Sequence, residues 1–153
     1  INATNTTPCD GERIMLTATG GNTFQWNNGV INGVSFVPAA PGNYWVTVTD
    51  VNGCKDSASI FIDILPIPNV VASSSSTEIC LGDSVLLDAT GAVSYSWTNP
   101  VIPNGTYYTP PGIGPNTFTV EGTAANGCTN ASQVAVLVNP TTSSLSMCPG
   151  PLN

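Results

Sequence analysis

Cysteines are the residues of this chain whose type and spacing most directly suggest chemistry. Cys9 and Cys54 are separated by about 45 to 50 residues, and so are Cys80 and Cys128. We therefore expect disulfides that join Cys9 to Cys54 and Cys80 to Cys128, each pinning strand ends at one pole of a small domain. In the chain-entropy model such a crosslink adds about 3 to 4 kcal/mol. Disulfides of this kind indicate an oxidising compartment.

Catalysis and metal binding have few suitable residues. The chain contains no His, which removes the Ser–His and Cys–His arrangements of covalent catalysis, and its nine acidic residues are scattered. A zinc site needs four converging ligands, whereas each region offers only two cysteines. Asp50 with Asn52, or Asp10 with Glu12, could offer oxygens to calcium, but neither spacing matches a calcium loop and turn formation is preferred. We expect no enzyme, no metal and no cofactor.

Three aromatic residues are candidates for ligand contact. Trp45 is out of phase with Tyr44 and Val46, so it faces solvent if those two face the core. An exposed Trp could stack on a sugar ring. Packing against a neighbouring strand, domain or protofilament is the alternative that we prefer, and the same two alternatives apply to Tyr107 and Tyr108.

Charge excludes two classes of partner. The sequence has 2 basic and 9 acidic residues, which gives a formal net charge of −7, so we expect it to bind neither nucleic acid nor anionic lipid. Charged residues make up 7% of the chain, well below the roughly 25% that is usual in soluble domains. No apolar stretch approaches the roughly 18 residues of a membrane span, so no membrane insertion is expected in this segment.

Hydrophobic alternation at period two predicts strands throughout the chain, separated by turns rich in Gly, Asn and Pro. Short strands at this spacing predict an all-β fold of β-sandwich domains, with about seven strands in each. Trp26 and Trp97 lie on such strands and should anchor the cores. The last strand of each domain should end near a proline, Pro66 or Pro140.

The sequence also repeats itself. Three landmarks recur in the same order, as Cys9, Trp26 and Cys54 and then as Cys80, Trp97 and Cys128. We therefore predict one repeat over residues 1–66, whose first strand could be incomplete, and a second over 67–140. Residues 141–153, with Cys148, should begin a third. Such repeats are expected to be strung end to end in a longer chain.

The segment from Gly42 to Cys54, preceded by the Gly-Gly-x-x-Phe-x-Trp element at residues 20 to 26, resembles the Ig-like repeats of Bacteroidota cell-surface proteins. These include gliding-motility adhesins and other cargo of type IX secretion. The second repeat departs from the pattern, with Gly122 and Ala124 where Val48 and Asp50 stand.

That resemblance implies tandem Ig-like domains in a secreted, extracellular protein of the cell surface. The implied function is non-enzymatic cell adhesion, as a stalk or adhesive segment of a large adhesin or filament. Implied partners are further repeats of the same chain, with extracellular polysaccharide or lateral copies of the protein as further options. The alternative function is a carbohydrate-binding module of an exported polysaccharide-degrading enzyme.

Two serines match a modification motif of the same family. Asp56-Ser57-Ala58 and Asp83-Ser84-Val85 resemble the Asp-Ser/Thr-aliphatic sequence that carries O-linked glycans on exported Bacteroidota proteins. The alternative is that each serine merely begins a strand after an acidic turn residue. The resemblance implies a glycoprotein that is modified at Ser57 and Ser84.

Overall fold

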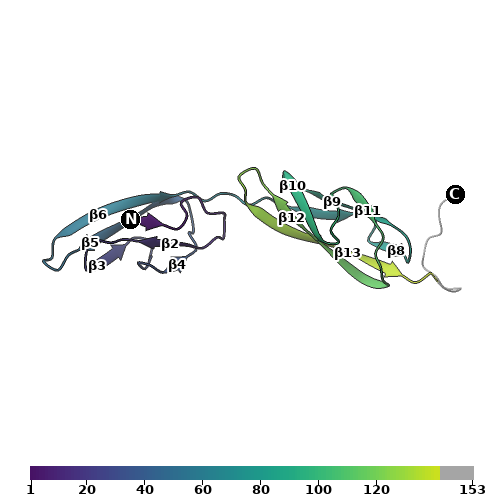
Figure 1. Ribbon diagram of the computed structural model, residues 1–153, viewed down its shortest axis with the longest axis horizontal. Coiled ribbons are helices and arrows are strands. Elements are labelled where there is room, and N and C mark those ends of the chain that lie inside the picture. The colour runs from purple at the N-terminus through teal and green to yellow at the C-terminus, as the bar shows by residue number, and fades with distance from the viewer. Residues whose placement is uncertain (142–153) are drawn as a thin grey trace. The chain divides into compact units, whose positions relative to one another are not determined.

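A computed structural model describes residues 1–141 of the chain, and across this range it contains strands and no helix (Figure 1). The chain divides into two compact units, Ile1–Pro66 and Ile67–Asn153, which we call unit 1 and unit 2. The expected start of a third repeat, including Cys148, lies outside the described residues apart from its first position.

Unit 1 consists of two three-stranded sheets with a core between them. The first sheet has the order β1-β2-β4 and contains β1 (Asn2–Ala3), β2 (Ile14–Thr17) and β4 (Ser35–Phe36). The second has the order β3-β5-β6 and contains β3 (Thr23–Trp26), β5 (Gly42–Thr49) and β6 (Lys55–Ile62). All pairings between these strands are antiparallel.

Unit 2 has the same plan with one more strand. Its first sheet has the order β11-β9-β7 and contains β7 (Val71–Ser74), β9 (Val85–Thr90) and β11 (Thr106–Tyr108). Its second sheet has the order β10-β12-β13-β8 and contains β8 (Glu78–Cys80), β10 (Ser94–Asn99), β12 (Gly114–Thr123) and β13 (Thr129–Asn139). The chain changes sheets between its first two strands. β7 pairs antiparallel with β9 in the first sheet, and β8 pairs parallel with β13 in the second.

Unit 1 has six strands rather than the expected seven, and the difference lies at its opening cysteine. The segment that corresponds to β8 forms only one bridge, between Cys9 and Leu65. Pro8 lies in this segment and has no N–H to donate to a ladder, although its carbonyl accepts a bond of 2.8 Å from the Leu65 amide. The edge is therefore paired at a few positions without becoming a regular strand.

Alternation along the strands fills each core from both sheets. In β9, Val85 and Leu87 are fully buried while Leu86 between them is half-buried, because successive side chains of a strand point to opposite faces. In β2, Ile14 and Leu16 are likewise fully buried, and Met15 between them is half-buried. Burying such a side chain contributes about 1.5 to 3 kcal/mol. In the core of unit 1, burial raises the pKa of the Tyr44 hydroxyl above its usual value.

Each core also contains a buried Trp that is held by an Asn. Trp26 is 8% exposed and Trp97 is 1% exposed, which confirms both as core residues. The indole N–H of Trp26 donates to Asn32 Oδ1 at 3.2 Å, and that of Trp97 donates to Asn104 Oδ1 at 3.1 Å. Each Asn amide donates in turn to the carbonyl of a buried alanine. The same polar contact therefore orients the largest core residue of both units.

Replacing Trp97 by Ala should destabilise unit 2 by about 3 to 5 kcal/mol, because a large buried side chain is lost and Asn104 loses its donor. Hydrogen exchange in peptides of unit 2, together with urea unfolding followed by circular dichroism, would measure the loss. Trp45→Ala is the matched control, since it removes an exposed indole and should change stability by about 0.5 kcal/mol or less. Equal effects of the two substitutions would contradict the assigned core.

Candidate functional site

The two cysteines of each unit lie at opposite ends of its last strand. Cys54 directly precedes β6, whereas Cys9 bridges Leu65 beyond the far end of that strand. Cys128 directly precedes β13, whereas Cys80 pairs with the last residue of that strand. At about 3.3 Å per residue these strands hold each pair roughly 30 Å apart, whereas a disulfide needs Cα atoms within about 7 Å. The predicted bridges from Cys9 to Cys54 and from Cys80 to Cys128 are therefore wrong.

The bonding states of the cysteines differ between the units. Cys9, Cys80 and Cys128 are disulfide-bonded, as expected for these three residues. Cys54 is an exposed free thiol, which corrects its assignment as a bridge partner. The matched spacing arises because the repeat itself is copied, and it does not mean that the two cysteines of one unit meet. We call the end that carries Cys54 or Cys128 the closing pole, and the end that carries Cys9 or Cys80 the opening pole.

Tight turns present the cysteines at the closing poles. A carboxylate oxygen of Asp50 accepts hydrogen bonds from the backbone N–H groups of Asn52 and Cys54, both at 2.8 Å. In unit 2 the side chain of Asn126 accepts a bond of 3.0 Å from the Cys128 N–H. The Asp50 carboxylate thus forms the turn, in agreement with the interpretation preferred over calcium binding.

Carboxylates also fix the cysteines at the opening poles. The backbone N–H of Cys9 donates to Glu12 Oε2 at 2.9 Å, and that of Cys80 donates to Asp83 Oδ2 at 3.3 Å. The Glu12 carboxylate is thus engaged in its local turn. Asp10 is the other member of the residue pair considered for calcium. Within residues 1–141, no cluster of three or more Cys, Asp or Glu side chains is placed to hold a metal ion.

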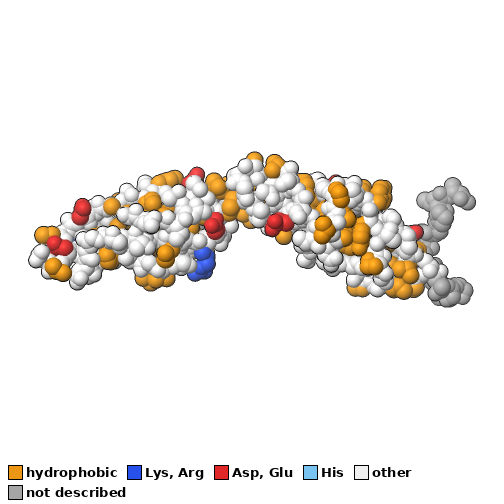
Figure 2. Space-filling view, in the orientation of Figure 1, with side chains coloured by type: hydrophobic (Ala, Val, Ile, Leu, Met, Phe, Trp, Pro, Cys, Tyr) orange, Lys and Arg blue, Asp and Glu red, His pale blue; other side chains and the backbone are white. Residues whose placement is uncertain are grey.

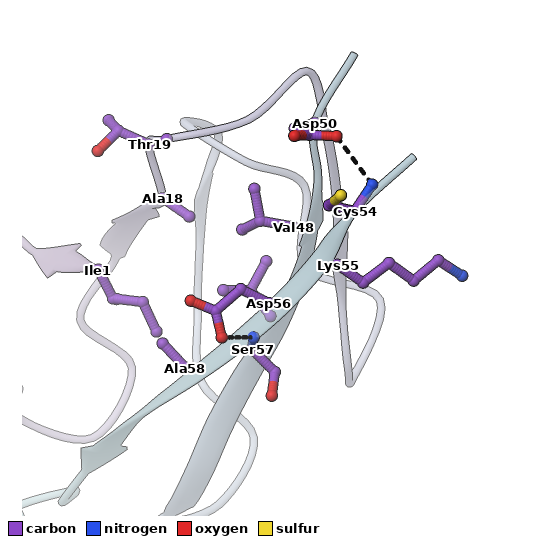
Figure 3. Close-up of a pocket in the computed structure, with 12 residues that line it drawn as sticks. Ile1, Ala18, Thr19, Val48, Asp50, Cys54, Lys55, Asp56, Ser57 and Ala58 are labelled. Atoms are coloured by element: carbon purple, nitrogen blue, oxygen red, sulfur yellow. Dashed lines mark hydrogen bonds between the residues drawn. The ribbon is translucent and has the colours of Figure 1, made fainter. Parts of the chain in front are cut away.

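A depression of about 310 Å³ opens at the closing pole of unit 1. Figure 3 shows Ala18, Val48 and Ala58 around it, with Cys54 at the rim (Figure 3). One carboxylate oxygen of Asp56, also in the lining, accepts a bond of 2.8 Å from the Ser57 N–H. The depression combines aliphatic and polar side chains with the exposed free thiol of Cys54 and the carboxylate of Asp56.

A second, shallow depression of about 410 Å³ lies beside Trp45. Trp45 is 60% exposed, in agreement with its predicted orientation toward solvent. Gln25, Thr47 and Ser57 line the same depression, so the structure brings together the proposed ligand contact and one proposed glycosylation site. Aromatic and hydrogen-bonding groups side by side could accept a sugar ring.

The two tyrosines have different surroundings. Tyr107 is 70% exposed on β11, an edge strand. Tyr108 is half-buried and packs edge-on against Phe118, with ring centroids 5.8 Å apart and an interplanar angle of 79°. Tyr108 therefore packs at the margin of the core, in agreement with the preferred alternative for this residue, whereas Tyr107 is largely exposed.

Both candidate glycosylation sites are exposed, but they lie in different units. Ser57 lies in β6. Ser84 directly precedes β9, and its hydroxyl oxygen is 2.8 Å from that of Thr109. A glycan on either hydroxyl would project away from the core.

The visible surface carries few charged side chains, and most of it is uncharged polar groups and backbone (Figure 2). Over residues 1–141 the chain forms no helix long and apolar enough to cross a membrane.

Comparisons with known proteins give a distant structural likeness. No protein-family model matches the chain, and no curated protein matches its sequence. Among solved structures, the fibronectin(III)-like modules of Clostridium thermocellum CbhA match with 11% sequence identity and a TM-score of 0.38. The match covers 88% of this chain and 89% of that chain.

Alkylation of the native, non-reduced chain should label Cys54 and leave Cys9, Cys80 and Cys128 unlabelled, because only a free thiolate attacks the reagent. Mass spectrometry of tryptic and chymotryptic peptides would locate the label. Cys54→Ser should lose that label without loss of folding, since the residue is exposed. After reduction and denaturation all three remaining landmark cysteines should react. Label on Cys9 in the native chain would contradict the assigned bonding states.

Proposed function

We propose that this chain is a non-enzymatic stalk and adhesive segment of a long extracellular protein, with tandem Ig-like domains arranged end to end. One observation carries the proposal: two units repeat the same framework, including the Trp with its Asn partner and cysteines at opposite poles. A framework that is copied with its cysteines in place is typical of an array of modules.

The course of the chain through unit 1 supports the end-to-end arrangement. Ile1 lies at the closing pole, where it lines the depression. Leu65 lies at the opening pole, where it bridges Cys9, and the unit ends one residue later at Pro66. The chain therefore enters the unit at one pole and leaves it at the other. Modules traversed in this way extend a stalk as they are added.

The chemistry of the surface supports an extracellular, non-enzymatic role. Three cysteines are disulfide-bonded, and disulfides persist mainly in oxidising compartments. The carboxylates of Asp50, Glu12 and Asp83 accept bonds from local backbone N–H groups, so they act in turns. The family resemblance extends this proposal to a surface adhesin or filament that is exported by type IX secretion and acts in gliding motility.

Carbohydrate binding is the second candidate function, and the exposed Trp45 favours it. Its indole lies beside Gln25 and Thr47, which offer hydrogen-bonding groups next to an aromatic face. A module of this kind would deliver a polysaccharide-degrading enzyme to its substrate. The same surface would serve an adhesin that binds extracellular polysaccharide.

Cell-surface labelling tests the proposed function. Antibodies against residues 1–141 should bind intact cells of the source organism, and disruption of the gene should reduce attachment to surfaces. Purified chain should release no sugar from a panel of polysaccharides. Loss of polysaccharide degradation on disruption, with attachment unchanged, would favour the carbohydrate-binding module instead.

Affinity electrophoresis with soluble polysaccharides would test the Trp45 surface. If this surface binds sugar, Trp45→Ala should abolish retardation, because stacking on the indole supplies much of the contact area. Val93→Ala in unit 2 is the control, since it removes an exposed apolar side chain that is not a candidate for sugar contact. Retardation that survives the Trp45 substitution would assign binding to another surface.

Mass spectrometry of protein purified from its native source should find O-linked glycan on Ser57 and Ser84. Ser59 is the internal control, because it is exposed on the same strand as Ser57 but follows an alanine in place of an aspartate. Glycan on Ser59 as well would show that exposure, and not the motif, directs modification. Bare peptides at both Ser57 and Ser84 would reject the prediction.

A further inference from the structure

The depression of unit 1 can be compared with the closing pole of unit 2, because the two poles correspond residue by residue. Strand register aligns them: Trp26 pairs with Val46 as Trp97 pairs with Val120. Gly20 and Gly91 occupy equivalent turns with φ of 97° and 93°. By the same alignment Val48, Asp56 and Ala58 of unit 1 correspond to Gly122, Asn130 and Ser132 of unit 2.

In unit 2 the segment Pro68–Val71 fills this place. Val70 is 7% exposed and belongs to the core cluster. A methyl group on Gly122 would lie 2.6 Å from Val70 Cγ2, and one on Gly91 would collide with the carbonyl of Asn69. The Asn130 amide donates to the Pro68 carbonyl at 3.0 Å. The pole of unit 2 is thus closed by the chain that leads into it.

In unit 1 the equivalent place is open. A methyl group on Gly20 would meet nothing within 4 Å, in contrast to one on Gly91. Two differences adapt the site to another segment. Val48 replaces Gly122, so the occupying side chain must be smaller than Val70 or shifted. Asp56 replaces Asn130, so the side chain accepts hydrogen bonds where Asn130 donates one.

The closing cysteines of the two units also differ, in exposure and in bonding. Cys128 is 1% exposed and disulfide-bonded, whereas Cys54 is exposed and free. Neither sandwich can supply the partner from its own opening cysteine, since the last strand separates the two. A closing cysteine therefore cannot bond with the opening cysteine of its own unit. The opening cysteine of another repeat has the required chemistry, and both described units carry one, Cys9 or Cys80.

We propose that the closing pole of unit 1 is a docking site for a preceding repeat of the same kind. The connecting segment of that repeat fills the depression as Pro68–Val71 fills it in unit 2, and its opening cysteine forms a disulfide with Cys54. This inference deepens the proposed stalk, because each junction is then both packed and crosslinked. Formation of the bond removes two protons and two electrons from the two thiols. A small disulfide such as oxidised glutathione accepts them and becomes two thiols.

A chain with a duplicated repeat tests the proposal. Residues 1–71 are added before Ile1, so that Val71 of the added copy precedes Ile1 as Val71 normally precedes Ala72. This junction keeps the register, since the pairing of Asn2 with Thr17 corresponds to that of Ser73 with Asp88. The protein is folded in a glutathione redox buffer, alkylated without reduction and mapped by mass spectrometry.

The original Cys54 should lose its label and be recovered in a disulfide with Cys9 of the added copy, while Cys54 of the added copy takes the label. Cys9→Ser in the added copy should restore label on the original Cys54. Val70→Asp in the added copy should reduce linkage without unfolding either unit 1, because it places a charge in the depression.

Full label on the original Cys54, both in the duplicated chain and in a version that carries Val70→Ala in the added copy and Asp56→Asn in the original copy, would overturn the proposal. A covalent dimer of the duplicated chain through two original Cys54 residues, formed in preference to the linkage within one chain, would also overturn it and assign the pole to a second copy. The experiment needs no cell surface, so a negative result leaves the proposed adhesive function intact. A failure of cell labelling would likewise leave the docking proposal intact.

Discussion

The length of the final hairpin in each unit is the constraint on which the rest of the structure depends. β5 pairs with β6 over eight residues, and β12 pairs with β13 over ten. This ladder spans the sandwich and contributes buried residues such as Val46 and Val136 to the core. It also carries the chain from the closing pole to the opening pole. Once the ladder is formed, the two cysteines of a unit cannot meet.

Each core is organised around a Trp whose one polar atom is satisfied. The indole N–H of Trp97 needs an acceptor, since a buried donor without a partner costs about 1 to 3 kcal/mol. Asn104 supplies it, and its amide donates to Asp88 Oδ1 at 2.9 Å as well as to a backbone carbonyl. Within residues 1–141, no buried side-chain polar atom lacks a partner. Saturated polar contacts of this kind fix the position of a large side chain, which apolar packing alone specifies less sharply.

The two units show how one framework is adapted at its poles while its core is kept. Val46 and Val120 are equivalent and both fully buried. Two residues further along each strand, Val48 and Gly122 differ, and Gly122 is the one that admits the chain segment leading into its unit. Val48 lines an open depression at the pole of unit 1, whereas Gly122 leaves room for the segment that closes the pole of unit 2. Variation of this kind leaves the repeat fold unchanged.

Sequence alone determined the all-β class, the repeated framework and the burial of Trp26 and Trp97, because these depend on local alternation and on turn residues. It also determined that Trp45 faces solvent, since side-chain direction alternates along a strand. The partner of each indole was not predicted, because Asn32 and Asn104 lie outside the strands and meet the Trp only in the folded unit. The packing partner of Tyr108 could not be identified, because Phe118 comes from the opposite sheet.

Only the tertiary structure decided the bonding of the cysteines and the open pole of unit 1. Spacing along the chain shows that a motif is copied, but a disulfide depends on distance in space, which the register of β6 and β13 sets. The contrast between free Cys54 and bonded Cys128 has no counterpart in their shared Asn-Gly-Cys sequence. A bond between two cysteines depends on their distance in the folded chain, which the shared local sequence does not set.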